Sequence, residues 1–121
     1  MTQEDKELLL KDLCARLPYG VIIQIKDWTV LDAELKIGHI NRLQINDVEL
    51  KPYLFPMSSM TEEQKVIYGD LCYSIIQSLA KNMQSELNEL INWLNAHHFD
   101  YRGLIEKGLA IPVTKENNPY K

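Results

Sequence analysis

The feature that most constrains the fold is an alternating stretch, LDAELKI, at residues 31–37. Apolar residues occupy its first, third, fifth and seventh positions, and charged residues occupy the positions between them. Successive side chains of a β-strand point to opposite faces of the sheet, so this pattern predicts a strand with one buried and one wet face. An antiparallel sheet usually has this arrangement, and helices are expected before and after the whole sheet.

Shorter runs next to this strand predict its partners. Apolar residues alternate at residues 21–25, and Leu43 and Ile45 follow the central stretch. Turn-prone residues separate these runs, so we expect an antiparallel meander of three or four strands over residues 20–51. The segment KPYLFPMSS, residues 51–59, contains two prolines that remove backbone donors, and we expect it to be an extended connector on the surface.

The segment before the sheet has the signals of a helix over residues 3–17. Thr2 is a suitable N-cap, and acidic residues follow it in the first turn. On a helical wheel Cys14 shares a face with Leu9 and Leu13. The wheel therefore predicts that Cys14 is a thiol buried in the core.

The C-terminal half is expected to be helical. Thr61 and the glutamine three residues after it form a capping-box pattern, which predicts a long helix over residues 62–82. We expect a second helix over residues 86–98 and a short third helix over residues 101–107. The predicted fold class is α+β, with an N-terminal helix, the meander, and then three helices packed on one face of the sheet.

The length of 121 residues fits one domain with a single core. We assign residues 1–113 to this domain, including a short edge strand within residues 109–113. The remaining residues, 114–121, read TKENNPYK and are expected to be a polar, frayed tail.

Composition and charge exclude several classes of function. Thirteen basic and seventeen acidic residues give a net charge of −4 without a basic cluster, so a nucleic-acid partner is not expected. No apolar run approaches the roughly 20 residues of a membrane helix, and the N-terminus does not resemble a secretory signal. Two distant cysteines favour reduced thiols, and we expect a cytoplasmic protein that does not associate with membranes. The usual nucleotide, zinc and hydrolase motifs do not occur, so no cofactor or metal is expected.

One short segment concentrates side chains that could carry chemistry: His97, His98, Asp100, Tyr101 and Arg102. One hypothesis makes it an active site of a small enzyme or ligand-binding protein, with Asp100 orienting a histidine while Tyr101 and Arg102 hold an anionic substrate. The other makes both histidines packed residues at a helix end and Asp100 the N-cap of the next helix. We favour the structural interpretation because a nucleophile and a phosphate loop are both missing.

The long helix predicted over residues 62–82 has more apolar residues than one buried face needs. Besides its main apolar arc, Val66, Tyr73 and Ala80 form a second stripe with a spacing of seven residues. The stripe either packs under the first helix or forms an exposed patch for a protein partner or a second copy of the chain. Internal packing is the commoner outcome in so short a chain, but only the exposed position would support a function.

Two stretches carry a resemblance: KPYLFPMSSMTEEQK, residues 51–65, and WLNAHHFDYRGLIEKGLA, residues 93–110. In sequence, order and spacing they resemble a group of short, uncharacterised proteins of gut anaerobic bacteria and of their phages or mobile elements. The resemblance implies an accessory protein of a bacterial genome or prophage and supplies no reaction. Together with the second apolar stripe, it favours a non-catalytic protein that binds another protein through this stripe or through the open edge of the sheet.

Overall fold

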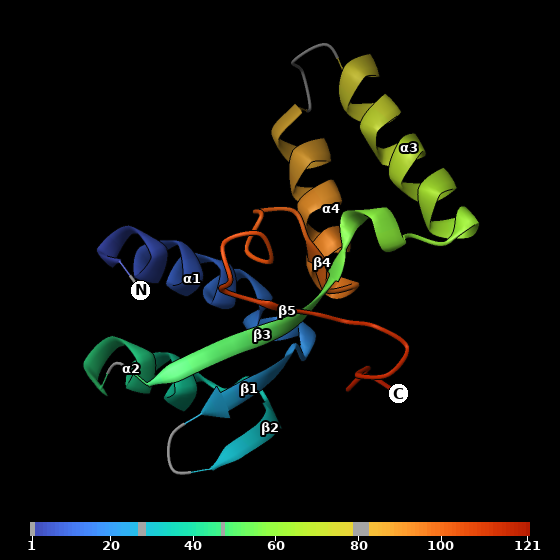
Figure 1. The fold of residues 1–121 in the computed structure, drawn as a ribbon. Helices are drawn as coiled ribbons and strands as arrows, with labels where there is room; N and C mark the ends of the chain where they lie inside the picture. The colour runs from blue at the N-terminus through green and yellow to red at the C-terminus, as the bar shows by residue number, and fades with distance from the viewer. Residues whose placement is uncertain (1, 27–28, 47, 79–82) are drawn as a thin grey trace.

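The chain combines helices and a sheet, as the sequence predicts. The computed structural model describes residues 2–26, 29–46, 48–78 and 83–121. Figure 1 shows two parts, which we call the body and the hairpin. The body contains the sheet with helices α1 and α2 and the C-terminal segment, and the hairpin consists of helices α3 and α4, which extend away from it.

The sheet is built around its third strand. Strands β1 (Ile22–Lys26) and β2 (Val30–Glu34) form an antiparallel pair, and β1 also pairs antiparallel with β3 (Glu49–Pro56). The second half of β3 pairs in parallel with two short strands, β4 (Phe99–Asp100) and β5 (Ile111–Pro112). The strand order is β2-β1-β3-β4, so β2 is an edge strand.

Helix α2 (Ile37–Asn46) replaces the further strand that we expected around Leu43, and this part of the meander prediction is wrong. Ile40 and Leu43 are buried and lie three residues apart, on one face of a short helix. The first turn is fixed by His39, whose Nδ1 accepts the backbone N–H of Lys36 at 2.9 Å. A turn-like sequence therefore begins a helix, and α2 connects β2 to β3.

The expectation of a surface connector over residues 51–59 is also wrong, because most of this segment belongs to β3. Leu50 and Leu54 are buried within the strand. Its two prolines lie where the missing N–H does little harm: Pro52 is the last residue paired with β1, and Pro56 is the last residue of β3.

Helix α1 (Gln3–Arg16) and a 3-10 turn (Leu17–Tyr19) precede the sheet, close to the predicted range. The Thr2 hydroxyl accepts the backbone N–H of Asp5 at 3.0 Å, and the Asp5 carboxylate accepts the N–H of Thr2 at 3.4 Å. The predicted cap is confirmed as a reciprocal capping box.

The buried face of α1 is not the face that the leucines alone suggest. Leu9 and Leu13 are buried as predicted, but Cys14 is exposed, and the prediction of a core thiol is wrong. Asp12 and Arg16 are fully buried instead, because the buried positions follow the spacing i, i+3, i+4, i+7. The core therefore contains two charged side chains.

The main core lies between α1, α2 and the sheet, and the chain after α4 closes it. Its buried members come from α1, β1, α2, β3 and the segments between and after them: Leu9, Leu13, Val21, Ile23, Ile25, Leu35, Ile40, Leu43, Leu50, Leu54, Leu104, Leu109 and Ala110. No residue of α3 or α4 belongs to this cluster among the described residues. The body therefore has a core of its own.

The hairpin follows a short 3-10 turn (Met57–Ser59) and consists of α3 (Glu62–Gln77) and α4 (Met83–Ala96). The capping box predicted at Thr61 is confirmed, since its hydroxyl accepts the N–H of Gln64 at 3.1 Å and the Gln64 side chain accepts the N–H of Thr61 at 2.9 Å. The predicted end of the long helix lies at residues 79–82, outside the described residues.

A small second cluster, formed by Met60, Leu94 and Phe99, joins the base of the hairpin to the body. The chain after Phe99 forms turns rather than the short helix that we expected over residues 101–107. Gly103 and Gly108 adopt positive φ in this segment, and this interrupts a regular helix.

Tyr120 connects the C-terminal segment to the body. The Tyr120 hydroxyl accepts the backbone N–H of Ile22 at 3.0 Å and donates to the carbonyl O of Tyr53 at 2.7 Å. One side chain thus bridges β1 and β3, and the expected edge strand is present as β5.

Candidate functional site

The two adjacent histidines at the end of α4 have different surroundings. His97 is exposed; its Nδ1 lies 2.9 Å from the carbonyl O of Trp93, and its ring lies 4.7 Å from the Trp93 ring. His98 adopts a φ of 61°, the only positive φ of a non-glycine residue in the described chain, and stacks on Tyr120 with a centroid distance of 4.2 Å. The two rings therefore pack against different neighbours and do not form a pair.

His98 is a weak base in this position. Burial lowers the pKa of its imidazole from 6.5 to about 4, and the nearby Arg16 and His97 contribute to the same shift. Its Nδ1 is buried without a hydrogen-bond partner. The ring is therefore neutral at neutral pH, and its pKa lies far below the range of a general base working there.

Asp100 binds backbone N–H groups, but the helix that it was expected to cap is absent and turns follow it. Its Oδ1 accepts the N–H of Leu104 and its Oδ2 accepts the N–H of Ile105, both at 3.0 Å. The carboxylate is almost fully buried. Because both oxygens are engaged by the backbone, this residue organises the chain after β4.

Arg102 belongs to a buried ionic network centred on Asp12. The Asp12 carboxylate accepts a hydrogen bond from Arg16 Nε at 2.7 Å through one oxygen and from Arg102 Nε at 3.1 Å through the other. Arg16 Nη2 also donates to the carbonyl O of Phe99 at 2.6 Å. These bonds join α1 to the segment that leaves α4, so Asp12 and the two arginines hold the hairpin to the body.

Tyr101 completes this network. Its hydroxyl donates to Asn95 Oδ1 at 2.8 Å, and its ring lies 5.2 Å from the Arg16 guanidinium and 5.0 Å from that of Arg102. A ring flanked by two cations stabilises both through its π face. Sequence reasoning missed Asp12 and Arg16, although their spacing of four residues on the buried side of α1 is a usable signal.

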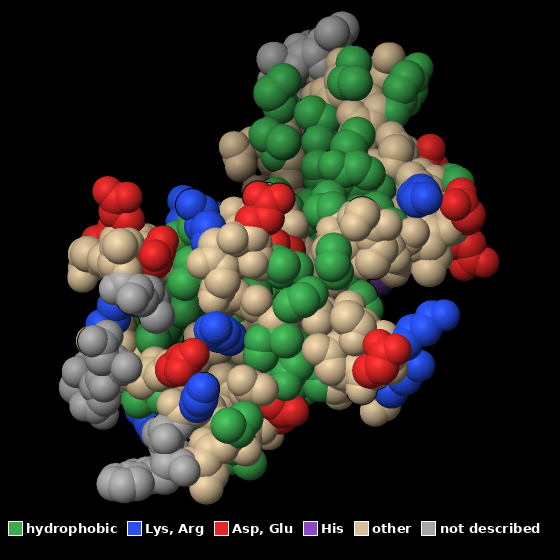
Figure 2. Space-filling model, in the orientation of Figure 1, with side chains coloured by type: hydrophobic (Ala, Val, Ile, Leu, Met, Phe, Trp, Pro, Cys, Tyr) green, Lys and Arg blue, Asp and Glu red, His purple; other side chains and the backbone are tan. Residues whose placement is uncertain are grey.

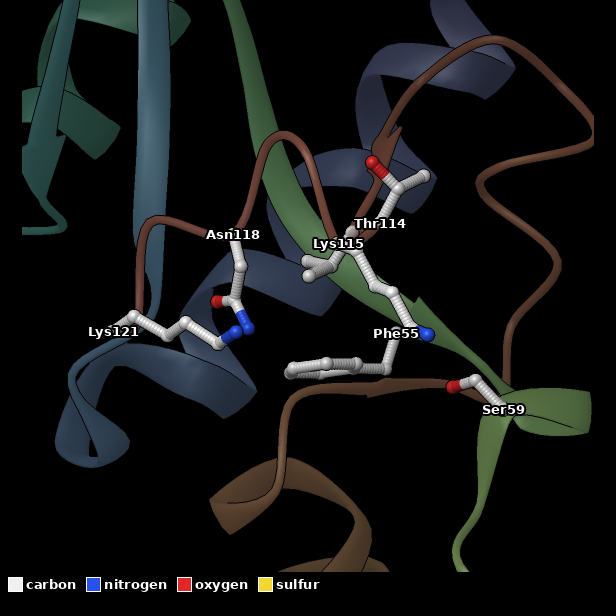
Figure 3. Close-up of a pocket in the computed structure, with 7 residues that line it drawn as sticks. Phe55, Ser59, Thr114, Lys115, Asn118 and Lys121 are labelled. Atoms are coloured by element: carbon white, nitrogen blue, oxygen red, sulfur yellow. The ribbon is translucent and has the colours of Figure 1, made fainter.

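Two pockets lie near this segment. Asp100 lines one of about 370 Å³, together with residues of the turn after β3. The other, of about 320 Å³, is shown in Figure 3, where Phe55 lies between the C-terminal segment and the turn that carries Ser59, and Lys115 and Lys121 approach from the tail. Neither of these two pockets is lined by a histidine, and Asp100 is the one candidate residue that lines either of them.

The second apolar stripe is exposed, and the expectation that it packs under the first helix is wrong. Val66 and Tyr73 are each 63% exposed, and Ala80 lies outside the described residues. The physical reason is the position of α1, which lies against α4 and not against α3. Ile76, which is 67% exposed, extends the surface.

We call Val66, Gly69, Tyr73 and Ile76 the α3 stripe. The half-buried side chains of α3 fall on a different side of the helix, which packs against α4: Tyr68, Leu71, Cys72 and Ile75. No residue of α3 is buried. Figure 2 shows hydrophobic side chains gathered over both helices of the hairpin, in contrast to the mixed surface of the body.

The described part of the chain has neither a grouped set of metal-binding side chains nor a helix that could cross a membrane. Within it, no three His, Cys, Asp or Glu side chains are grouped closely enough to hold a metal ion. None of its helices has both the length and the apolar character needed to cross a bilayer. Comparisons with protein-family models, with curated proteins and with solved structures found no match.

Proposed function

We propose that this protein is a non-catalytic accessory protein that binds another protein chain through the α3 stripe. The observation that carries the proposal is the state of α3, a helix of 16 residues that has several large exposed apolar side chains and no buried residue. Such a helix contributes little to the core of its own chain. Its composition is that of a surface that becomes buried in a complex.

The energetics support this interpretation. Full burial of an apolar side chain of this size contributes roughly 1.5–3 kcal/mol, and the exposed side chains of Val66, Tyr73 and Ile76 forgo most of it in the isolated chain. The body does not need them, since its own core is complete without α3. A partner that covers the stripe would recover this free energy.

The edge of the sheet is a weaker candidate for the binding surface. Val30 and Leu31 on the edge strand β2 are each 58% exposed. However, β2 is only five residues long and carries Asp32 and Glu34, and short charged edge strands resist pairing with other chains. None of the four residues of the α3 stripe is charged, so the stripe has no comparable barrier to contact with another chain.

Site-specific photocrosslinking in cells that express the protein from its own gene would test the proposal. A photoreactive phenylalanine derivative at Tyr73 should give a defined covalent adduct of higher mass. The matched control is the same group at Ser74, which is also exposed but is turned about 100° around α3. Absence of an adduct at Tyr73, or equal adducts at both positions, would overturn the proposal.

A further inference from the structure

The α3 stripe has the spacing of a helix-pairing surface. Val66, Gly69, Tyr73 and Ile76 follow one another at intervals of three, four and three residues. This is the a and d spacing of a heptad, in which a second helix can pack along the stripe at a small crossing angle. The surface therefore fits an α-helix lying alongside α3.

Gly69 leaves room for such a helix. Apart from the backbone of its own helix and its chain neighbours, a Cβ placed at this position would meet no atom within 4 Å, so the stripe is open at its second position. A glycine on a helix face lets the backbone of a neighbouring helix approach closely. The larger Val66 and Tyr73 stand on either side of this opening along the stripe.

The charges beside the stripe identify the partner. Lys65 and Asp70 occupy the g and e positions of this heptad. If a second α3 packs in parallel, Lys65 of each copy lies beside Asp70 of the other, which gives two pairs of opposite charge. An antiparallel pair with the same apolar contacts would place Lys65 beside Cys72 of the other copy and Asp70 beside its Gln77. Neither contact pairs opposite charges.

Lys65 is available for this contact. Its Nζ lies 3.2 Å from Glu62 Oε1 in its own chain, but both side chains of this pair are exposed. Surface ion pairs of this kind contribute little, so Lys65 can exchange its partner at low cost.

We propose that the partner of the α3 stripe is α3 of a second copy of this chain, packed in parallel about a two-fold axis with Lys65 and Asp70 paired between the copies. The inference rests on the proposed function, because it requires that the α3 stripe binds a protein chain. A symmetric pair is the commonest form of self-association, and it places each stripe residue next to its own counterpart.

Disulfide trapping tests the orientation. In a chain with Cys14→Ser and Cys72→Ala, Tyr73→Cys should form a disulfide-linked dimer under mild oxidation, because a parallel pair places residue 73 beside its counterpart. Ile67→Cys, an exposed position outside the stripe, is the matched control and should stay unlinked. Dimers that instead require a mixture of Gly69→Cys and Tyr73→Cys chains would show antiparallel packing and overturn the proposal.

Sedimentation equilibrium of the full chain tests the charge pairing. Lys65→Glu and Asp70→Lys should each weaken self-association about tenfold, and the double variant should restore it. A chain that stays monomeric at every concentration up to about 1 mM would overturn self-association. The proposed function would then survive only if the crosslinked adduct at Tyr73 had a mass other than twice that of the chain.

Discussion

The body and the hairpin use their apolar side chains in opposite ways. In the body, α1 places Leu9 and Leu13 in complete burial, and the sheet and α2 cover the rest of the core. In the hairpin, α3 has no buried residue and leaves Tyr73 and Ile76 more than half exposed. Helix α3 is no less apolar than α1, so the difference lies in what covers each helix.

This difference separates stability from binding. A core that is complete without α3 leaves the surface of α3 free to change without loss of the fold. The connection between the two parts is polar, through Asp12 and its two arginines, and aromatic, through Phe99. Substitutions in the body should therefore affect unfolding, and substitutions in the α3 stripe should affect association alone.

The largest effect is expected for Asp12→Ala. This substitution leaves Arg16 buried and without its carboxylate, and loss of one member of a buried ion pair costs about 3–5 kcal/mol of unfolding free energy. Chemical denaturation measures this loss of unfolding free energy. The control is Glu34→Ala, which breaks the exposed pair with Lys36 and should have a much smaller effect. Equal effects of the two substitutions would show that the network is not buried in solution.

The next effect compares the two parts directly. Leu13→Ala should lower the unfolding free energy by about 2–5 kcal/mol because Leu13 is fully buried. Ile76→Ala should change it by less than about 0.5 kcal/mol in the monomer because Ile76 is mostly exposed. Both are measured by denaturant titration at low protein concentration. A loss of several kcal/mol for Ile76→Ala would mean that α3 belongs to the core.

Elements whose signals are local were predictable from the sequence. The signals that begin α1 and α3 each lie within four residues: the N-cap of α1 was located at Thr2, and the capping box of α3 was located at Thr61. The antiparallel pair β1 and β2 follows from alternation on both sides of a short turn. The acceptor role of Asp100 also depends on nearby residues, four and five positions later, but the helix that it was expected to cap is absent.

Elements that depend on tertiary context were not predictable in this way. Helix α2 was missed because Ile40 and Leu43 supply only one turn of helical spacing, next to a strand pattern. Strand β3 was missed because its prolines argue against a strand until its pairing with β1, β4 and β5 is known. The Asp12 network joins residues 90 positions apart, and no local pattern can show that.

A smaller effect is expected where the C-terminal segment meets the sheet. Tyr120→Phe removes the hydroxyl that bonds to Ile22 and Tyr53, leaving one N–H and one C=O without this partner. Loss of such bonds should cost about 1–2 kcal/mol in thermal or chemical unfolding. Tyr73→Phe is the control, because its ring is exposed, and it should be neutral. If Tyr120→Phe changed the unfolding free energy as little as Tyr73→Phe does, the C-terminal segment would not be bound to the sheet in solution.

The last effect is absent at neutral pH, grows only as the pH falls below 6.5, and again distinguishes the body from its surface. The pKa of His98 is about 4 in the folded chain and 6.5 is its ordinary value, so between these values the unfolded chain binds a proton that the folded chain does not. The contribution of His98 therefore lowers the unfolding free energy as the pH falls through this window, and it is constant above pH 6.5. His98→Asn keeps a residue that tolerates positive φ and removes the titration, so its unfolding free energy should fall less over the same range. Chemical denaturation of the unchanged chain and of His98→Asn at several pH values measures the difference between their unfolding free energies. The carboxylates titrate in both chains, so their contributions cancel in this difference. A difference that stays constant through the window would show that the His98 imidazole is open to water and that Tyr120 does not cover it.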